Sequence, residues 1–245
     1  MSPDRGHRPS GPDPRTALAP LERALVAHHE GRSATVRVHM NDGGVEDLPS
    51  RVFFRSGQDL RGADQAALEL ARGRVLDVGA GAGAVALALE AAGHRVTALA
   101  VLPGLVRVLA ARGLRDARRG DLWTFRSRVR YDTVIALMNG TAAAGSLAGL
   151  EHLLRALAGP LAPRGQFLID STDLRTTGRP ASRPDGRYVG ELQYQLEYDG
   201  ERGPPFPQLF VDRARLGSAA RAVGLTASTV WRGEGGEYLA RLVRG

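Results

Sequence analysis

The chain has 245 residues, of which 43% are hydrophobic and 24% charged, as is ordinary for a globular protein with one large domain. It contains no cysteine, which excludes disulfide bonds, a cysteine nucleophile, thiolate zinc sites and iron–sulfur clusters. It also contains no lysine, so all 33 basic residues are arginine and no Schiff base can form on the protein. Only two isoleucines occur. This usage is typical of a GC-rich genome, and we expect a bacterial origin.

The formal net charge of +7 is concentrated in one segment. Residues 105–130 hold eight arginines and two aspartates, which leaves +6. The segment is either a patch for phosphate or nucleic acid, or a solvated helix face followed by a charged edge strand. We favour the second interpretation, because only Trp123 and Phe125 interleave with the arginines as aromatics that stack on bases.

The N-terminal part of the chain is expected to lie outside the core. Residues 1–15, rich in Pro, Gly, Arg and Ser, predict a disordered tail. Residues 16–72 predict a cap of a helix, a hairpin and a second helix. Its expected elements are a helix over 16–29, strands over 35–40 and within 45–54, and a helix over 60–71. No stretch has the roughly 20 uncharged apolar residues of a spanning helix, and no signal peptide is apparent, so we expect a cytoplasmic protein without membrane contact.

From residue 73 to 245 the pattern is that of an α/β core. Strands and helices alternate, which is typical of a parallel sheet covered on both faces. The expected strands are 74–78, 94–99, 131–137, 165–170, 225–231 and 237–243, and the expected helices are 84–92, 103–112, 147–161 and 212–223. Residues 175–211 interrupt this core as an insertion, with an Arg- and Pro-rich loop and one long alternating strand over 188–198.

The most informative motif is LDVGAGAG at 76–83, a glycine turn between an expected strand and an expected helix. Bare backbone at such a turn lets the polar groups of a ligand approach closely. The spacing satisfies both a loose dinucleotide fingerprint and a shorter G-x-G-x-G turn. Asp77 separates the two, because a carboxylate there would repel a pyrophosphate but suits the amino group of a zwitterionic, methionine-like moiety.

Over about 70–172 the chain resembles the class I S-adenosylmethionine-dependent methyltransferases. Five motifs occur in the order found in that family: LDVGAGAG, HRVTALAVLP, GDLWTF, YDTVIALMNG and LAPRGQFLIDSTD. The resemblance implies a doubly wound α/β fold with a mostly parallel seven-stranded sheet, helices on both faces and an antiparallel C-terminal strand, here with an added small antiparallel lid. It also implies S-adenosylmethionine as the cofactor.

The resemblance further implies roles for individual residues. In that family the glycine turn holds the methionine end of the cofactor. An acidic residue after the third strand and the neighbouring backbone meet the adenine, and the end of the fourth strand faces the sulfonium and the substrate. The matching cofactor-binding positions here are Asp77, Gly79, Ala80, Gly81, Ala100, Val101, Asp121, Leu122, Met138 and Asn139. No metal is expected.

One position departs from the family pattern. The second strand usually ends in an Asp or Glu that binds both ribose hydroxyls, but Ala100 stands there when the sequence is aligned on Pro103. Hydrogen bonds to a charged group contribute roughly 1.5–3 kcal/mol each, so their loss should weaken cofactor binding. Three outcomes stay open: weaker binding of the same cofactor, a different nucleoside ligand, or a methyltransferase fold used for another purpose.

The candidates for catalysis are Asn139, at the end of the fourth strand, and Asp170 and Asp173, at the end of the fifth. Because the carboxyl ends of strands form the ligand crevice in open α/β sheets, the two carboxylates either act there or simply cap a loop. His39, in the expected hairpin, is a further candidate base, although a lone histidine of this kind is more often structural. The fourth strand lacks the Asn-Pro-Pro-Tyr type of motif that marks methylation of amide or exocyclic amino nitrogens.

The predicted function is methyl transfer to a small organic acceptor, a natural product or a metabolite. Seven of the 13 aromatic residues lie within 16–72 and 188–211, where they line an acceptor pocket or form the core of the lid. They are Phe53, Phe54, Tyr188, Tyr194, Tyr198, Phe206 and Phe210. Two alternatives stay open: an RNA methyltransferase that uses the arginines of 105–130, and a catalytically inert relative that acts as a binding protein.

Overall fold

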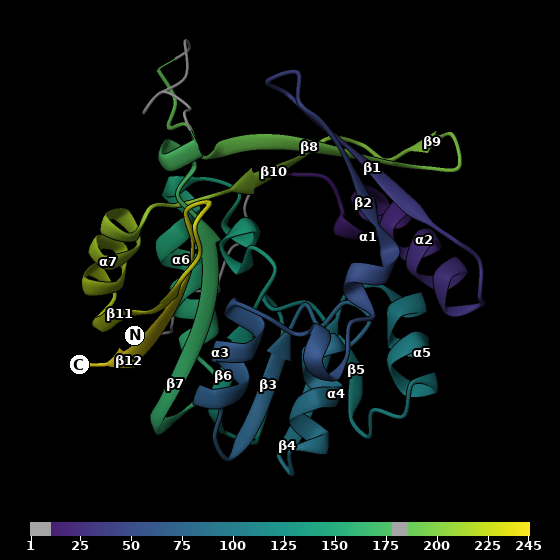
Figure 1. Ribbon diagram of the computed structural model, residues 1–245. Helices are drawn as coiled ribbons and strands as arrows, with labels where there is room; N and C mark the ends of the chain where they lie inside the picture. Colours follow the sequence, from purple (N-terminus) through teal and green to yellow (C-terminus); the bar gives the residue numbers. More distant parts are fainter. Residues whose placement is uncertain (1–10, 178–185) are drawn as a thin grey trace.

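The computed structural model describes residues 11–177 and 186–245, and it consists of two β-sheets with helices around them. In Figure 1 a five-stranded antiparallel sheet lies across the top of a seven-stranded mixed sheet, and the carboxyl ends of the central strands point toward it. We call the five-stranded sheet the lid sheet and the seven-stranded sheet the core sheet. None of the helices in the described residues is long and apolar enough to cross a membrane.

The core sheet confirms the predicted fold class. Its strand order is β11-β12-β7-β6-β3-β4-β5, with parallel pairing from β7 to β5 and antiparallel pairing of β12 with both of its neighbours. The strands are β3 (Arg74–Val78), β4 (Arg95–Ala100), β5 (Ala117–Arg119), β6 (Tyr131–Ala136), β7 (Leu161–Thr172), β11 (Leu225–Arg232) and β12 (Glu237–Arg244).

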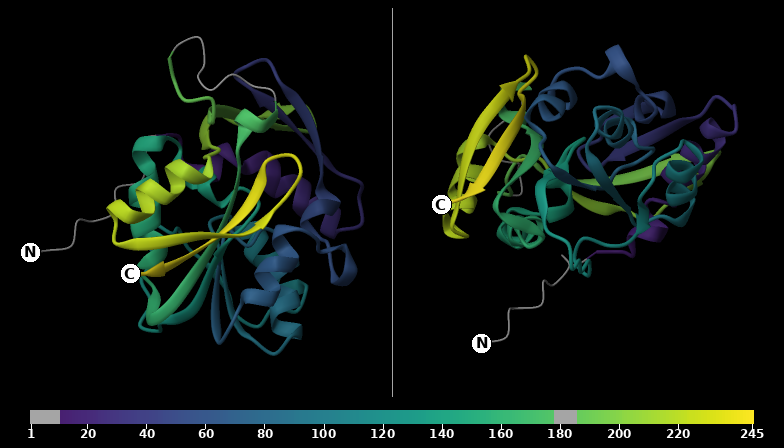
Figure 2. Two further views of the ribbon diagram at one scale, coloured as in Figure 1. Left: turned by 60° about the vertical axis from the view of Figure 1, so that its left-hand side comes forward. Right: turned by 90° about the horizontal axis from the view of Figure 1, so that it is seen from below.

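Helices cover both faces of the core sheet, as the apolar strands require. They are α3 (Ala63–Leu70), α4 (Ala84–Ala91), α5 (Pro103–Ala111), α6 (Leu147–Ala158) and α7 (Arg213–Ala222). Helix α3 packs beside α4 on one face, and α6 packs beside α7 on the other, with α7 against the β11–β12 hairpin (Figure 2). The consecutive residues Val75 and Leu76 of β3 are both fully buried, each in a different hydrophobic cluster. A strand buried on both faces is the mark of a parallel sheet between two helical layers.

The lid sheet is built from two segments that are far apart in the sequence. Its order is β10-β8-β1-β2, with the short β9 paired to β8. The strands are β1 (Thr35–Met40), β2 (Val45–Pro49), β8 (Glu191–Tyr198), β9 (Glu201–Arg202) and β10 (Phe206–Leu209). Helix α2 (Ala19–His29) packs against β1 and β8 on one side and against α5 of the core on the other. The N-terminal hairpin and the insertion therefore form one structure, held to the core through α2.

Several element boundaries differ from the expectations. The expected helix over 16–29 is two helices, α1 (Pro14–Ala17) and α2, because Pro20 has no N–H with which to continue the first one. Strand β2 stops at Pro49, where the 3₁₀ helix η1 (Ser50–Phe53) begins. Short 3₁₀ turns also form at η2 (Gly57–Asp59), η3 (Gly140–Ala144) and η4 (Leu174–Thr177). Most of the expected disordered tail and of the expected mobile loop fall in residues 1–10 and 178–185, outside the described residues.

Candidate functional site

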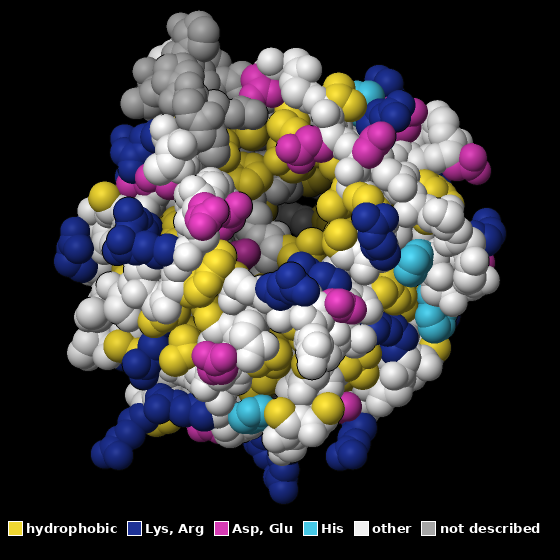
Figure 3. Space-filling model, in the orientation of Figure 1, with side chains coloured by type: hydrophobic (Ala, Val, Ile, Leu, Met, Phe, Trp, Pro, Cys, Tyr) yellow, Lys and Arg dark blue, Asp and Glu magenta, His cyan; other side chains and the backbone are white. Residues whose placement is uncertain are grey.

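Two adjoining cavities open where β3, β4 and β6 end, between the core sheet and the lid. The large cavity has a volume of about 390 Å³ and the small cavity about 230 Å³, and both are lined by Leu18, Gly79, Val101, Leu137 and Met138. Figure 3 shows the hollow from outside, with hydrophobic side chains around it. The size and mainly apolar lining are those of sites for small ligands, at the crevice where ligands bind in open α/β sheets.

The glycine turn forms one wall of the small cavity. The N–H groups of Gly79 and Ala80 donate to the Leu99 carbonyl at 2.9 and 3.3 Å, which ties the turn to β4. Gly81 has φ +55°, a left-handed conformation that glycine adopts without strain, and a Cβ there would lie 3.4 Å from the Phe53 ring. The turn therefore presents bare backbone to the cavity, as the motif predicts.

The small cavity also contains three charged groups that suit a zwitterion. Asp77 is only 5% exposed, and burial together with the neighbouring Asp64 carboxylate raises its pKa to about 7. Arg55 pairs with Asp64 at 2.7 Å (Nη2 to Oδ2), while its buried Nε has no hydrogen-bond partner in the described part of the chain. Among the residues that the structure describes, Asp77 thus has no strong positive partner and Arg55 keeps an unused donor, so this cavity fits an amino group beside a carboxylate.

The end of β4 lies at the same cavity. Ala100 lines it with 3% of its surface exposed, among the side chains of Leu18, Leu21 and Leu105. Its backbone carbonyl accepts a hydrogen bond from the N–H of Gly120 at 3.0 Å, which pairs β4 with the end of β5. Ala100, which the sequence alignment on Pro103 predicts at the place of the ribose-binding acid, thus lines the cavity with an apolar side chain.

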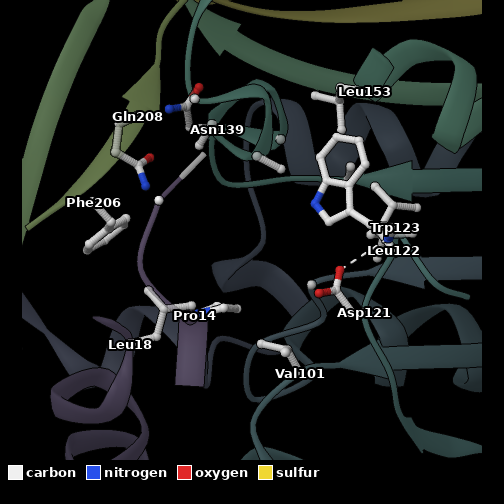
Figure 4. Close-up of a pocket in the computed structure, with 18 of the residues that line it drawn as sticks. Pro14, Leu18, Val101, Asp121, Leu122, Trp123, Asn139, Leu153, Phe206 and Gln208 are labelled. Carbon is white, nitrogen blue, oxygen red and sulfur yellow. Dashed lines mark hydrogen bonds between the residues drawn. The ribbon is translucent and has the colours of Figure 1, made fainter. Parts of the chain in front are cut away.

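The large cavity has an apolar end that suits a nucleobase. Val101, Leu122 and Trp123 line this end. Asp121 adds one carboxylate, which accepts a hydrogen bond from the backbone N–H of Trp123 at 3.1 Å (Figure 4). Only Gly120 separates Asp121 from the end of β5. A carboxylate beside flat apolar walls fits an aromatic base that carries an exocyclic amino group.

A strained turn after β6 borders the two cavities, with Met138 lining both of them and Asn139 the large one. Met138 and Asn139 both have φ +62°, an uncommon conformation for residues other than glycine. The Asp170 carboxylate accepts hydrogen bonds from the N–H groups of Asn139 (3.1 Å) and Gly140 (2.8 Å) and so holds the turn in place. Burial raises the pKa of Asp170 to about 6, although these two hydrogen bonds act in the opposite direction. Asp170 thus lies behind the turn and is not among the lining residues of either cavity.

The predicted residues fall into two groups in space. All ten predicted cofactor-binding residues line one or both cavities. Of the three predicted catalytic residues, only Asn139 does so. Asp173 binds Arg175 through two hydrogen bonds of 2.9 and 2.8 Å, and this arginine lowers the pKa of the Asp173 carboxyl. His39 lies in the lid sheet, 2.8 Å from Glu197, and is also absent from the lining of both cavities.

The arginines of 105–130 do not line either cavity. Arg112 is a structural residue: its guanidinium donates to the carbonyls of Ala82 and Phe54 and lies 4.9 Å above the Phe54 ring. Arg118 pairs with Asp116 at 2.7 Å. These arginines therefore contribute to packing and surface charge, not to the walls of the site.

Two parts of the site were not predicted. Arg55 follows η1 and pairs with a residue of α3, and in a chain with 33 basic residues nothing in the local pattern distinguishes it. Gln208 of β10, together with Gly11, Pro12 and Pro14, lines the large cavity from the lid side, beside Phe206. The aromatic content of 188–211 indicated such a wall in general, and Phe206 belongs to that set.

Comparisons with known proteins agree with this geometry. No protein-family model and no curated protein matches the chain. A crystal structure of an S-adenosylmethionine-dependent methyltransferase from Bacteroides fragilis, in complex with S-adenosyl-L-homocysteine, is 31% identical, covers 96% of this chain and 98% of its own, and has a TM-score of 0.84. The CcbJ methyltransferase from Streptomyces caelestis is 16% identical over 75% of this chain and 90% of its own, with a TM-score of 0.62. A methyltransferase from Clostridium acetobutylicum is 11% identical over 77% and 94%, with a TM-score of 0.60.

The last two relatives share the fold, whereas the first shares the fold and nearly a third of the residues over almost the whole length. The charged groups of the small cavity fit the amino acid end of S-adenosylmethionine, and Asp121 with its apolar neighbours fits the adenine. The chain therefore belongs to the class I S-adenosylmethionine-dependent methyltransferases, with S-adenosylmethionine as its cofactor.

Proposed function

We propose that this methyltransferase acts on a small organic acceptor, which binds in the part of the large cavity between η3 and β10. The observation that carries the proposal is the enclosure of this region. Gly11, Pro12, Pro14, Phe206 and Gln208 cover it from the lid side, and η3 packs against β10 beneath them. Because the acceptor must fit under this cover, a small molecule suits the site better than a folded RNA.

The cofactor is proposed to lie across both cavities. Asp77 would meet its amino group, and the unused Nε of Arg55 its carboxylate. Backbone at Gly79, Ala80 and Gly81 would approach the same end. Asp121 and Leu122 would meet the adenine, and the backbone near Ala100 and Val101 would pass beside the ribose.

The residues of the chain would act mainly by alignment. S-adenosylmethionine carries a methyl group that is already activated on its sulfonium, so the protein has to bring the acceptor close and orient it. Met138, which is 45% exposed and lines both cavities, lies at their junction. Asn139 would contact the acceptor, and Asp170 would act as a positioning residue that holds the turn carrying both. Asp173 binds Arg175 and has no corresponding contact with this turn, so we assign it no role in aligning the acceptor.

The test is a transfer experiment with S-adenosylmethionine labelled in its methyl group. The protein is incubated with two fractions of one bacterial extract, metabolites below about 1 kDa and total RNA. We expect label in the metabolite fraction and none in RNA. Binding of S-adenosyl-L-homocysteine is measured by calorimetry on the same preparation. Label in RNA would contradict the small-molecule acceptor, and binding without any transfer would favour the inert relative.

Two glycine variants provide the controls. Gly81→Val places a side chain in the small cavity and should abolish both binding and transfer. Gly93→Val introduces the same kind of strain at φ +90°, in the loop after α4, where a Cβ meets nothing within 4 Å. It should lower stability and leave binding intact. This pair separates loss of the site from loss of the fold.

A further inference from the structure

The side chain of Asn139 belongs to a compact polar network beside the acceptor region. One end of its amide lies 3.0 Å from the Thr141 hydroxyl and 3.3 Å from the Ser171 hydroxyl. The two hydroxyls are 2.7 Å apart, and Thr141 Oγ1 lies 3.0 Å from the Leu209 carbonyl. The other end of the amide is buried and has no partner among the described residues, and Asn139 is one of the residues that line the large cavity. It is therefore available to a ligand.

Counting protons decides which end of the amide faces the ligand. An asparagine amide keeps its shape when oxygen and nitrogen are exchanged, so both orientations must be compared. With Oδ1 toward the hydroxyls, four contacts share only the two hydroxyl protons, and Nδ2 is the orphaned group.

With Nδ2 toward the hydroxyls, every contact of the network has a proton. The amide donates to Thr141 and Ser171, Ser171 donates to Thr141, and Thr141 donates to the Leu209 carbonyl. Ser171 still accepts the N–H of Val211 at 2.9 Å. Buried polar networks are favourable only when their members are satisfied, so this orientation is the more stable one. It turns the Asn139 carbonyl oxygen into the cavity.

The network also ties Asn139 to the lid. Leu209 is the last residue of β10, and Val211 follows it, so the two hydroxyls that orient the amide also hold the end of this strand. Phe206 and Gln208 of the same strand line the cavity on the side of Asn139, away from Asp121 and Trp123 (Figure 4). Asn139 thus faces the acceptor region and not the region fitted to the adenine.

We propose that Asn139 presents its carbonyl oxygen to the acceptor, and that the acceptor is an amine whose N–H donates to it. The proposal rests on the proposed methyltransferase function. Asp121 is the one titratable side chain among the described lining residues of the large cavity, and it lies at the opposite end. A neutral amine needs no base: its lone pair forms the N–C bond, the C–S electron pair stays on sulfur to give S-adenosyl-L-homocysteine, and the ammonium product loses its proton to water. Thr141 and Ser171 are positioning residues.

The experiment uses a library of small amines with shape-matched alcohols and carboxylic acids, each incubated with protein and S-adenosylmethionine. Formation of S-adenosyl-L-homocysteine is the readout. We expect methylated products among the amines alone. Turnover confined to alcohols or carboxylic acids would overturn the proposal while leaving the methyltransferase function intact. No turnover from a protein that binds S-adenosyl-L-homocysteine would also overturn it, and absence of that binding would instead overturn the proposed function.

Variants of Asn139 test the orientation with the best amine. Asn139→Ala should lower kcat/KM at least tenfold while the affinity for S-adenosyl-L-homocysteine stays within about twofold. Asn139→Asp keeps an accepting oxygen and should retain more activity than the alanine variant. Its pH–rate profile should shift to higher pH, because the carboxylate favours the protonated, unreactive amine. An aspartate variant that binds the amine worse than the alanine variant would show that Asn139 presents its N–H groups instead.

The positioning role is tested at Thr141. Thr141→Val removes the hydroxyl at nearly constant volume and should raise the KM for the amine about tenfold. Thr141→Ser keeps the hydroxyl and should have a KM close to that of the wild type. Melting temperatures separate this effect from a loss of stability. Equal kinetics for the valine and serine variants would contradict the role of the network.

Discussion

Asp77 holds a carboxyl group inside the small cavity, and its protonation should control cofactor binding. Its pKa is raised to about 7, first by burial and then by Asp64. A bound ammonium group favours the charged carboxylate, so the pKa falls in the complex and binding releases a proton below pH 7. The affinity for S-adenosyl-L-homocysteine should therefore fall about tenfold between pH 8 and pH 6. Calorimetry across this range measures it.

Asp77→Asn is the matched variant, with the same shape and no titration. It should bind more weakly at pH 8 and show little pH dependence. A wild-type affinity that stays constant from pH 6 to pH 8 would mean that Asp77 does not meet the amino group of the ligand.

Ala100 gives the second prediction at a single position. It faces the small cavity where the family places a ribose-binding acid. Ala100→Asp should tighten binding of S-adenosyl-L-homocysteine by about 1–3 kcal/mol, roughly five- to a hundredfold, because a carboxylate can accept from both ribose hydroxyls. Without ligand the new charge would lie among Leu18, Leu21 and Leu105, so the melting temperature of the free protein should fall. Calorimetry and thermal unfolding measure the two effects.

Ala100→Asn serves as the control for size. The amide fills the same space without a charge and should give a smaller gain in affinity. Binding by the aspartate variant that is no tighter than that of the wild type would contradict the alignment of β4 with its counterpart in the family.

At the level of secondary structure, the sequence pattern predicted correctly those strands and helices that are determined by residues close together in the sequence. The alternation in Thr35–Met40 and the apolar run Arg74–Val78 have the predicted bounds. Ser146 caps α6 directly before the expected start of that helix at Leu147, with its hydroxyl accepting from the Gly149 N–H at 3.3 Å. These signals depend on residues within a few positions of one another.

The elements that were missed depend on partners far along the chain. Strand β5 has three residues, and its place is set by pairing with β4, Ala98 to Ala117 and Ala100 to Arg119. Strand β10 contains Pro207, and no strand was expected in this part of the insertion. As an edge strand of the lid sheet it tolerates a proline, because the missing N–H is not needed there.

Dependence on residues far apart in the sequence also limits how much of the site could be predicted. The glycine turn and Asp121 follow from motifs that are continuous in sequence. The role of Asp170 follows from hydrogen bonds to residues about 30 positions away, and that of Arg55 from the path of a loop. Neither relation leaves a pattern in the sequence.

Over the whole molecule, the surface charge predicts weak and unspecific contact with nucleic acid. Arginines lie at many separate places on the surface, and part of those in 105–130 are engaged in packing or ion pairs (Figure 3). We expect RNA binding with a dissociation constant no tighter than roughly 10⁻⁶ M at physiological salt, and weakening steeply as salt rises. A filter-binding titration at several salt concentrations measures this. Arg126→Gln with Arg128→Gln should reduce the salt dependence and leave methyl transfer unchanged. A tight, sequence-selective complex would contradict the small-molecule acceptor.

The pairing of β1 with β8 has a consequence for how the protein is made. Val38 pairs with Leu196, so β1 waits for a partner strand that is synthesised after β3 to β7. The core strands that carry the glycine turn and Asp121 lie between them and contact mostly one another. The cofactor half of the site can therefore assemble during translation, while the N-terminal hairpin stays unpaired. The acceptor cavity acquires its cover only when the two segments of the lid sheet have met above strands β3 to β7, which are synthesised between them.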